Sequence, residues 1–317
     1  MFQKSANISL KDRTIGVIER NDKYIQTGYN LMSIGKETYL FDSDGRVVHE
    51  WTSERSVFCS YLLPNGNLLR DGSENIIAVG FRTGGAAGFV EEVTWEGERV
   101  WSHLQTPISQ YLTHHDLQPL PNGNVLVLSW ERKTRDEAIA AGRRPELIPD
   151  NEVWNNIIME LKPNRNNANT NTKTDSSSNH GCGIGDAEVV WQWSVWDHLI
   201  QDYDSTKANY GDIAAHPECF DINCCPAYGK AGARDQSLLT KSKNKNDIDP
   251  NNTGSFGSGV TGERDWLHIN CISYDPIRDQ IAMSCNVHGE LVIIDHSTTM
   301  VGDVYVYIYI YILVCVY

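Results

Sequence analysis

A chain of 317 residues can hold one large all-β domain or two ordinary domains, and either would bury a substantial core. Its 27 Lys and Arg residues against 41 Asp and Glu give a net charge of −14. This balance argues against nucleic acid and anionic membranes as partners, since both reward basic surfaces. The nine Trp and fourteen Tyr residues favour sheets over helical bundles. The eight cysteines have no Cys-x-x-Cys spacing, so a zinc site or a disulfide framework has little support.

Residues 1–30 are expected to form an N-terminal segment with one edge strand at Arg13–Arg20. The opening residues, MFQKSANISLKDRTIGVIERND, lack the apolar core of a signal peptide. As written, the sequence therefore predicts a cytoplasmic protein.

Two strand–turn–strand units follow. Residues 38–51, TYLFDSDGRVVHEW, predict a β-hairpin, because an Asp-Gly pair between two apolar runs is a strong turn signal. The Asp-x-Asp-Gly run could also begin a calcium loop, but the later ligands of such a loop are absent. Residues 61–72, YLLPNGNLLRDG, predict a second unit around an Asn-Gly turn.

The same pattern then returns along the chain. Residues 90–103, VEEVTWEGERVWSH, repeat the first unit, and residues 116–130, DLQPLPNGNVLVLSW, repeat the second. Trp51 and Trp101 lie 50 positions apart, and the two Pro-Asn-Gly-Asn turns lie 57 apart. A further copy is divided among residues 156–163, 187–198 and 274–284.

Repeats of about 50 residues with four short strands each are typical of β-propeller blades. The chain contains no P-loop, which would point to a parallel sheet that binds nucleotides. The sequence therefore predicts an all-β fold, a β-propeller with about four blades present and with loop insertions.

Two polar insertions enlarge the later repeats, at residues 164–185 and 225–262, and we expect both to be irregular loops. Residues Arg135–Arg144 predict a short helix, and residues 196–218 predict a lid or rim helix. The partial propeller domain is expected to span residues 31–299.

Residues 300–317 need a separate explanation. The run VYVYIYIYILVCVY is too short for a helix that crosses a bilayer, which needs about 20 apolar residues. It alternates as a strand would, and it is also what translation of a TA-rich dinucleotide repeat yields. We interpret this tail as an artefact of the gene model, so that the propeller is expected to be truncated on its C-terminal side.

The first candidate site residues lie in the stretch Asp265–Asn270, DWLHIN. Side chains two apart on a strand share a face. His268 and Asn270 are therefore expected to point one way, and Cys271 with its apolar neighbours the other. An imidazole beside an amide can bind a polar group or take part in proton or group transfer.

A second pair emerges when the repeats are aligned by their turns. His114 then falls opposite His268, and Asp116 falls opposite Asn270, whereas the first repeat has no polar pair there. The adjacent His115 is expected to face the blade, unless a bulge exchanges the two histidines. The ends of the innermost strands form the usual site of a propeller, so these imidazoles are expected to share one funnel.

Imidazoles in one funnel could bind an anion, hold a metal ion, or act as nucleophile and acid/base. The simpler alternative is that each His only caps a neighbouring backbone carbonyl. The polar pair occurs twice at equivalent positions, however, which favours a functional role. No H-E-x-x-H or G-x-S-x-G motif occurs, which argues against zincins and α/β-hydrolases. Four tryptophans are expected to pack between blades, namely Trp51, Trp101, Trp191 and Trp193.

Taken together, these motifs resemble the arylsulfotransferase (ASST) family of PAPS-independent aryl-sulfate sulfotransferases. The resemblance covers residues 29–299, and its most specific elements are HHDLQPLPNGN and the D-W-x-H-x-N run. The stretches that carry it are residues 114–130, 189–204, 265–284 and 291–298. The resemblance implies a six-bladed propeller, of which about a third would be absent here. It also implies transfer of a sulfuryl group from a phenolic sulfate ester to a phenol through a sulfated histidine, without a nucleotide donor or other cofactor.

By this resemblance, His268 and Asn270 correspond to the family's channel His and Asn, which contact the transferring sulfuryl group. His114 or His115 corresponds to another active-site His. We therefore expect these four residues to be catalytic.

Asp116 and Asn286 are expected to bind substrate. The family often has an arginine in a Ser-Ser-Arg context near this point, whereas this chain reads Ser284-Cys285-Asn286. The histidine that accepts the sulfuryl group in the family lies in a later blade, beyond the start of the Tyr/Ile tail. These two departures leave open whether this chain is active.

Two other functions fit the same residues. One is an enzymatically silent propeller whose funnel binds a ligand. The other is a metal-dependent hydrolase in which His114, Asp116 and His268 are ligands. The leading hypothesis needs no metal, and its partners are a small phenolic sulfate donor and a phenol acceptor.

Overall fold

The computed structural model describes residues 16–73 (without 18 and 20), 81, 84–104, 110–165, 187–224, 264–287 and 290–297. Four predicted features lie wholly or largely outside these residues, namely the edge strand at 13–20, the insertions at 164–185 and 225–262, and the tail at 300–317.

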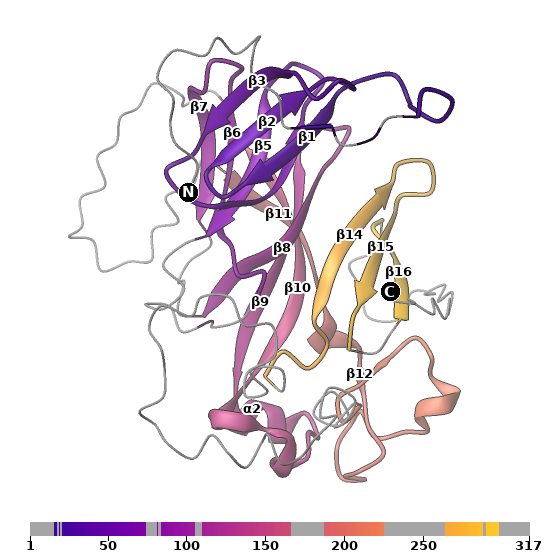
Figure 1. Cartoon of the computed structure of the whole chain (residues 1–317). Coiled ribbons are helices and arrows are strands. Elements are labelled where there is room, and N and C mark those ends of the chain that lie inside the picture. The colour runs from indigo at the N-terminus through magenta and orange to yellow at the C-terminus, as the bar shows by residue number, and fades with distance from the viewer. Residues whose placement is uncertain are drawn as a thin grey trace, which may run out of the picture.

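The described chain is all-β and forms consecutive antiparallel sheets in which each strand pairs with its neighbour in sequence (Figure 1). The first sheet contains β1 (Asn30–Ile34), β2 (Glu37–Phe41) and β3 (Val47–Thr52). The second contains β4 (Val57–Leu62), β5 (Leu68–Ser73), β6 (Gly88–Val93) and β7 (Arg99–Leu104).

The third sheet contains β8 (Tyr111–Pro119), β9 (Val125–Thr134), β10 (Glu152–Pro163) and β11 (Ala187–Ser194). The fourth contains β14 (Ile269–Asp275), β15 (Gln280–Cys285) and β16 (Glu290–Asp295). None of these sheets closes on itself within the described residues. The all-β class is therefore confirmed, and the propeller stays a prediction.

Helical structure is confined to short segments. The predicted short helix is confirmed as α2 (Arg135–Ala140), which begins with a capping box between Thr134 and Glu137. The predicted lid or rim helix at residues 196–218 is wrong. That region forms short 3₁₀ turns, η5 (Val195–His198) and η6 (Ile213–Ala215), and two short strands that pair in parallel, β12 (Leu199–Ile200) and β13 (Phe220–Asp221).

Two further 3₁₀ turns, η2 (Pro145–Leu147) and η3 (Pro149–Asn151), connect α2 to β10. No helix in the described part of the chain has the length and apolar character needed to cross a bilayer.

The predicted hairpins are confirmed. In the turn between β2 and β3, the Asp42 side chain accepts hydrogen bonds from the amides of Asp44 and Arg46, which fits the turn interpretation of the Asp-x-Asp-Gly run. The Pro-Asn-Gly-Asn turn before β5 has Gly66 at φ 87°. Glycine adopts this backbone conformation without steric cost, so the Asn-Gly signal predicted these turns well.

Successive sheets pack against each other through apolar clusters. One cluster, between the first and second sheets, contains Leu40, Trp51, Leu68 and Val93. The cluster between the second and third sheets includes Leu69, Trp101, Leu117 and Met159. The cluster between the third and fourth includes Leu128, Ile158, Ile272 and Met283. Burial of each such side chain stabilises the fold by about 1.5–3 kcal/mol.

A buried carboxylate also joins the second sheet to the third. Glu92 on β6 accepts hydrogen bonds from Asn67 of the Asn-Gly turn (2.6 Å) and from Trp101 (2.6 Å). Arg165, which follows β10 in the next sheet, forms an ion pair with the same carboxylate at 2.8 Å.

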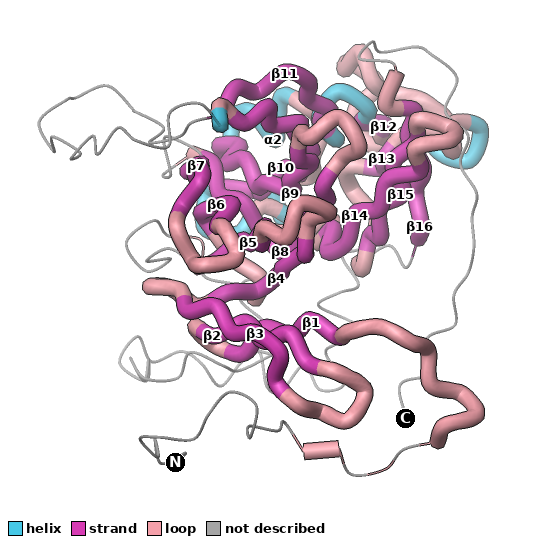
Figure 2. The backbone as a smooth tube through the Cα atoms, turned by 90° about the horizontal axis from the view of Figure 1, so that it is seen from above, coloured by secondary structure: helices cyan, strands magenta, loops and turns pink. Residues whose placement is uncertain are grey.

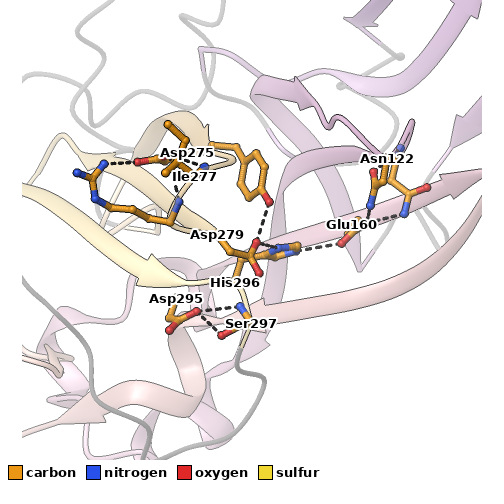
Figure 3. A network of polar contacts seen from close by, with 11 residues as sticks. Asn122, Glu160, Asp275, Ile277, Asp279, Asp295, His296 and Ser297 are labelled. Atoms are coloured by element: carbon orange, nitrogen blue, oxygen red, sulfur yellow. Dashed lines mark hydrogen bonds and ion pairs between the residues drawn. The ribbon is translucent and has the colours of Figure 1, made fainter.

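The third and fourth sheets are joined in the same way. Glu160 on β10 accepts a hydrogen bond from Asn122 at 3.0 Å and another from Asn124. His296, which follows β16, lies between Glu160 at 3.0 Å and Asp279 at 2.8 Å (Figure 3). The two networks occupy corresponding places in their sheets, so the repeat extends to the polar contacts between sheets.

The first strands of the later sheets, β4, β8 and β14, lie side by side (Figure 2). Each of them has a break in its pairing register, between Val57 and Ser60 in β4, between Thr113 and Leu117 in β8, and between Ile269 and Cys271 in β14. A β-bulge re-aims the side chains next to it. The bulges in β8 and β14 adjoin the predicted site residues.

Candidate functional site

The histidines predicted from the repeats meet in the structure. His114 and His115 lie in the bulge of β8, and His268 lies immediately before β14. The Nδ1 atoms of His114 and His115 are 3.0 Å apart. The rings of His115 and His268 are edge to face, with their centroids 4.7 Å apart. Two neighbouring sheets thus bring three imidazoles together.

The bulges explain how these side chains reach one another. His115 has φ 56° and His268 has φ 49°, a left-handed conformation that residues other than glycine rarely adopt. In β8 this turn of the backbone leaves His114 buried at 1% exposure and His115 half-buried beside His268. The bulge therefore exchanges the two histidines: His115 lies at the site and His114 packs into the blade. This is the alternative to the expectation that His115 faces the blade.

The expected alternation around His268 is partly wrong. Strand β14 begins only at Ile269, and its bulge falls at Asn270, so the period of two is interrupted there. Cys271 is exposed rather than turned inward with Leu267 and Ile269. His268 keeps its place at the site through its own left-handed backbone rather than through strand geometry.

Asp265 holds His268 at two points. Its Oδ2 atom lies 2.6 Å from Nδ1 of the ring, and its Oδ1 atom accepts the backbone N–H of His268 at 3.2 Å. The carboxylate itself is only 1% exposed. Burial alone would lower the pKa of His268, but the hydrogen bond and the charge of Asp265 outweigh burial and raise it above its usual value.

His114 has the opposite environment. Its ring stacks on Trp130 at 4.0 Å, and burial lowers its pKa well below the usual value, with the neighbouring His115 and His268 adding to the effect. Asn156 lies close enough to favour the charged form slightly. No well-formed hydrogen bond reaches Nε2 of His114 from any residue that the structure describes.

His115 is neutral for similar reasons. Burial, and then the charge of His268, lower its pKa to about 4. Its ring lies against Gly85, where an added Cβ would overlap Nε2, Cε1 and Cδ2 of the ring. The Gly85 carbonyl also accepts the backbone N–H of His115 at 2.8 Å.

The cluster is therefore electrostatically asymmetric. Near pH 7, His114 and His115 are neutral, whereas His268 holds a proton more readily because Asp265 stabilises its charge. A neutral imidazole can act as nucleophile or base, and an imidazolium can donate a proton or bind an anion. The site thus brings imidazoles of lowered and raised pKa into one group of contacting rings.

Asp116 does not join the histidines through its carboxylate oxygens. Oδ1 accepts the amide of Leu117 at 2.9 Å and the thiol of Cys59 at 3.3 Å, and Oδ2 accepts the amide of Ile272 at 3.0 Å. These contacts connect β8 to β4 and β14 and satisfy amides beside the bulges. Asp116 therefore braces the three inner strands.

Asn270 and Asn286 flank His268. Oδ1 of Asn270 accepts the hydroxyl of Ser284 at 2.6 Å, which orients its amide and leaves its N–H donors for other partners. Asn286 is exposed at the end of β15, and its backbone N–H binds the His268 carbonyl at 3.2 Å.

The metal-ligand alternative depends on His114, Asp116 and His268 converging on one point. The Asp116 oxygens face backbone amides and Cys59 instead, as above. Across the described ranges, no three His, Cys, Asp or Glu side chains are arranged to hold a metal ion.

Sequence reasoning missed Asp265, Trp130 and Gly85 as parts of the site. Asp265 was visible in the D-W-x-H-x-N run, three positions before His268, which is within reach once the backbone turns back. Gly85 lies in the run TGGAAG, which has no periodic pattern to indicate what would lie on it.

One comparison with known proteins identifies a family. The family model for arylsulfotransferase (ASST) matches residues 152–302. The match covers 151 of the 317 residues, just under half of the chain, and over these residues the chain is similar to the arylsulfotransferase family. The arylsulfotransferase region contains Asp265, His268 and Asn270, while His114 and His115 precede it. No curated protein matches the chain.

Proposed function

We propose that the protein is an aryl-sulfate sulfotransferase. It transfers a sulfuryl group from a phenolic sulfate ester to a phenol, through a histidine intermediate and without PAPS. The match of residues 152–302 to the arylsulfotransferase family model supports aryl sulfotransferase activity in general. The observation that carries the proposal is the contact between neutral His115 and His268, whose pKa Asp265 raises.

The chemistry follows from the charges involved. Sulfuryl transfer spreads negative charge over three oxygens, which positioned donors in a dry site can stabilise. In this proposal the histidine that accepts the sulfuryl group is the one that the family resemblance places in a later blade. Its neutral imidazole nitrogen attacks sulfur, the bond from sulfur to the aryl oxygen breaks, and the phenoxide leaves with the electron pair. His268 gives its proton to that phenoxide. The acceptor phenol then attacks the sulfated imidazole, and its proton returns to His268.

Each predicted residue has a role in this proposal. His115 and His268 contact the reacting group, and Asn270 donates its amide hydrogens to the sulfuryl oxygens. His114, which is buried, supports His115 through their shared hydrogen bond. Asn286 lies at the rim for the donor.

For Asp116, originally expected to bind substrate, we propose a brace between strands, since its oxygens already accept three donors.

We also propose that the sheets are blades of a partial β-propeller. Three observations support this architecture, namely the order of the sheets, the clusters between successive sheets, and the neighbouring positions of β4, β8 and β14. In a propeller these first strands would line a central channel, and the histidine cluster would lie at its mouth.

A chromogenic aryl sulfate tests the activity. The protein is incubated with that ester, with and without a phenol acceptor and with and without a chelator. We expect release of the coloured phenol that depends on the acceptor and survives the chelator. No turnover under any condition would contradict the proposal and favour a ligand-binding module. Loss of turnover with chelator would favour a metal-dependent hydrolase.

A further inference from the structure

We infer that Asp265 is a positioning residue of this site, which fixes the backbone and the ring of His268 so that Nε2 is the nitrogen presented to substrate. This inference rests on the proposed function. It adds a residue outside the predicted set and assigns it a defined task, the choice of the His268 tautomer and its proton.

The geometry gives Asp265 two separate contacts with one residue. Oδ1 accepts the His268 backbone N–H at 3.2 Å, and Oδ2 lies 2.6 Å from Nδ1 of the ring. His268 is held at φ 49°, a left-handed backbone conformation that is strained for a residue other than glycine. On the other side, the Asn286 N–H binds the His268 carbonyl at 3.2 Å. The strained residue is therefore fixed on both sides of its Cα.

The same contact determines the tautomer. Because the buried carboxylate accepts at Nδ1, that nitrogen carries the proton, and Nε2 is left on the far side of the ring. The neighbouring Arg264 does not compete for Asp265, since its guanidinium pairs with Asp150 and Glu152. Asp265 is thus committed to His268.

Within the described ranges, the titratable groups found beside His268 come from β8 and from the segment before β14. From β8 they are His115, whose ring is 4.7 Å away, and His114 behind it. From the segment before β14 the group is Asp265. Without that carboxylate, burial would disfavour the proton on His268 and leave three neutral imidazoles. Asp265 is therefore the source of the asymmetry of the site.

Asp265→Asn tests the inference with little change in volume. The asparagine amide can donate to Nδ1, which would stabilise the other tautomer and place the proton on Nε2. We expect kcat to fall by about 10²- to 10⁴-fold with little change in KM, as when a carboxylate that orients a catalytic histidine is replaced. We also expect the pH profile to lose the limb that belongs to His268. Asp265→Glu, which keeps the charge, should recover part of kcat.

Asp150→Asn is the matched control, because Asp150 pairs with Arg264 next to Asp265 but does not touch His268. It should leave kcat and the pH profile unchanged. A wild-type kcat and pH profile in Asp265→Asn would overturn the inference, as would an equal loss in the Asp150→Asn control.

A second readout does not depend on turnover. Nitrogen-15 spectra of labelled histidines report the tautomer and the pKa of His268 directly. In the wild-type protein we expect the proton on Nδ1 and a pKa above the usual value, and in Asp265→Asn a shift of the proton to Nε2 and a lower pKa. An unchanged tautomer and pKa would refute the inference even if the protein transferred no sulfuryl group. If Asp265→Asn fails to fold, the spectra of the wild-type protein decide, since a neutral His268 with its proton on Nε2, or a His268 pKa below the usual value, would refute the inference.

Discussion

Replacing Asp71 by asparagine should make the protein more stable at alkaline pH and change little at mildly acidic pH. Asp71 lies on β5, is 2% exposed, and accepts the backbone N–H of Cys59 at 2.7 Å. That amide lies in the bulge of β4, where strand pairing provides no hydrogen-bond partner for it. The Asp71 side chain provides the missing acceptor. An asparagine oxygen can accept the same hydrogen bond.

The magnitude follows from ionisation. Burial, with a smaller contribution from the charge of Asp116, raises the pKa of Asp71 from 3.8 to about 7 although the Cys59 amide opposes this. Between these values the folded protein holds a proton that the unfolded chain has released, so stability falls as the pH rises through this window. Between about pH 5 and about pH 8.5, the stability of the wild type falls only until the pH reaches the folded-state pKa of about 7. This interval of roughly two pH units lowers the free energy of unfolding by about 3 kcal/mol. The amide of the Asp71→Asn variant cannot ionise, so that variant should not show this loss.

Urea unfolding near pH 5 and near pH 8.5 measures the effect, since the titration of all other groups cancels when the variant is compared with the wild type. We expect the difference in unfolding free energy between Asp71→Asn and wild type to grow by about 2–3 kcal/mol between the two conditions. Asp275→Asn is the control. Hydrogen bonds from Arg278 and the Ile277 amide lower the pKa of Asp275, so it stays ionised across the range. An equal stability difference at both pH values would refute the reasoning.

Gly85→Ala should lower aryl-sulfate turnover at least about 10-fold and destabilise the fold by about 1–3 kcal/mol. Gly85 has φ 76°, and the new Cβ would displace the His115 ring. Turnover equal to wild type, in protein that circular dichroism shows to be folded, would refute the assigned position of that ring. Glu160→Gln should destabilise the fold by about 2–4 kcal/mol in urea unfolding, because a buried carboxylate with donors from Asn122, Asn124 and His296 loses its charge. The exposed Glu188→Gln on β11 is its control, and equal effects of the two would show that the contact between sheets contributes nothing.

Much of the local structure could be predicted from the sequence, because it depends on short-range chemistry. An Asn-Gly or Asp-Gly pair requires a turn wherever it stands, and the apolar runs on either side then pair in register. The hairpins before Trp51 and around Gly66 and Gly123 follow from this rule. The repeats also placed His114 and His268 in neighbouring sheets, which is why the site could be anticipated at all.

The site geometry could not be predicted, because it depends on bulges. A bulge is set by the partner strand, and the residues of β8 and β14 carry no local signal for it. The bulges place His115 rather than His114 against His268, and turn the Asp116 carboxylate toward the amide of Ile272. Strict alternation also gave the wrong side for Cys271.

The rim helix at residues 196–218 was a different kind of error. The sequence there carries no clear helical period, and Asp204 and Asp212 cap local turns with their side chains instead. Short side-chain to backbone hydrogen bonds of this kind compete with a helix.

The most direct test of the central claim compares wild-type protein with His268→Ala in the chromogenic aryl-sulfate assay with a phenol acceptor. We predict acceptor-dependent release of the coloured phenol by the wild type, and loss of at least about 10²-fold in His268→Ala, since a positioned acid contributes this much. Circular dichroism of both proteins confirms that each is folded. Full activity in His268→Ala would contradict the account, because the histidine cluster would then not be the site of transfer.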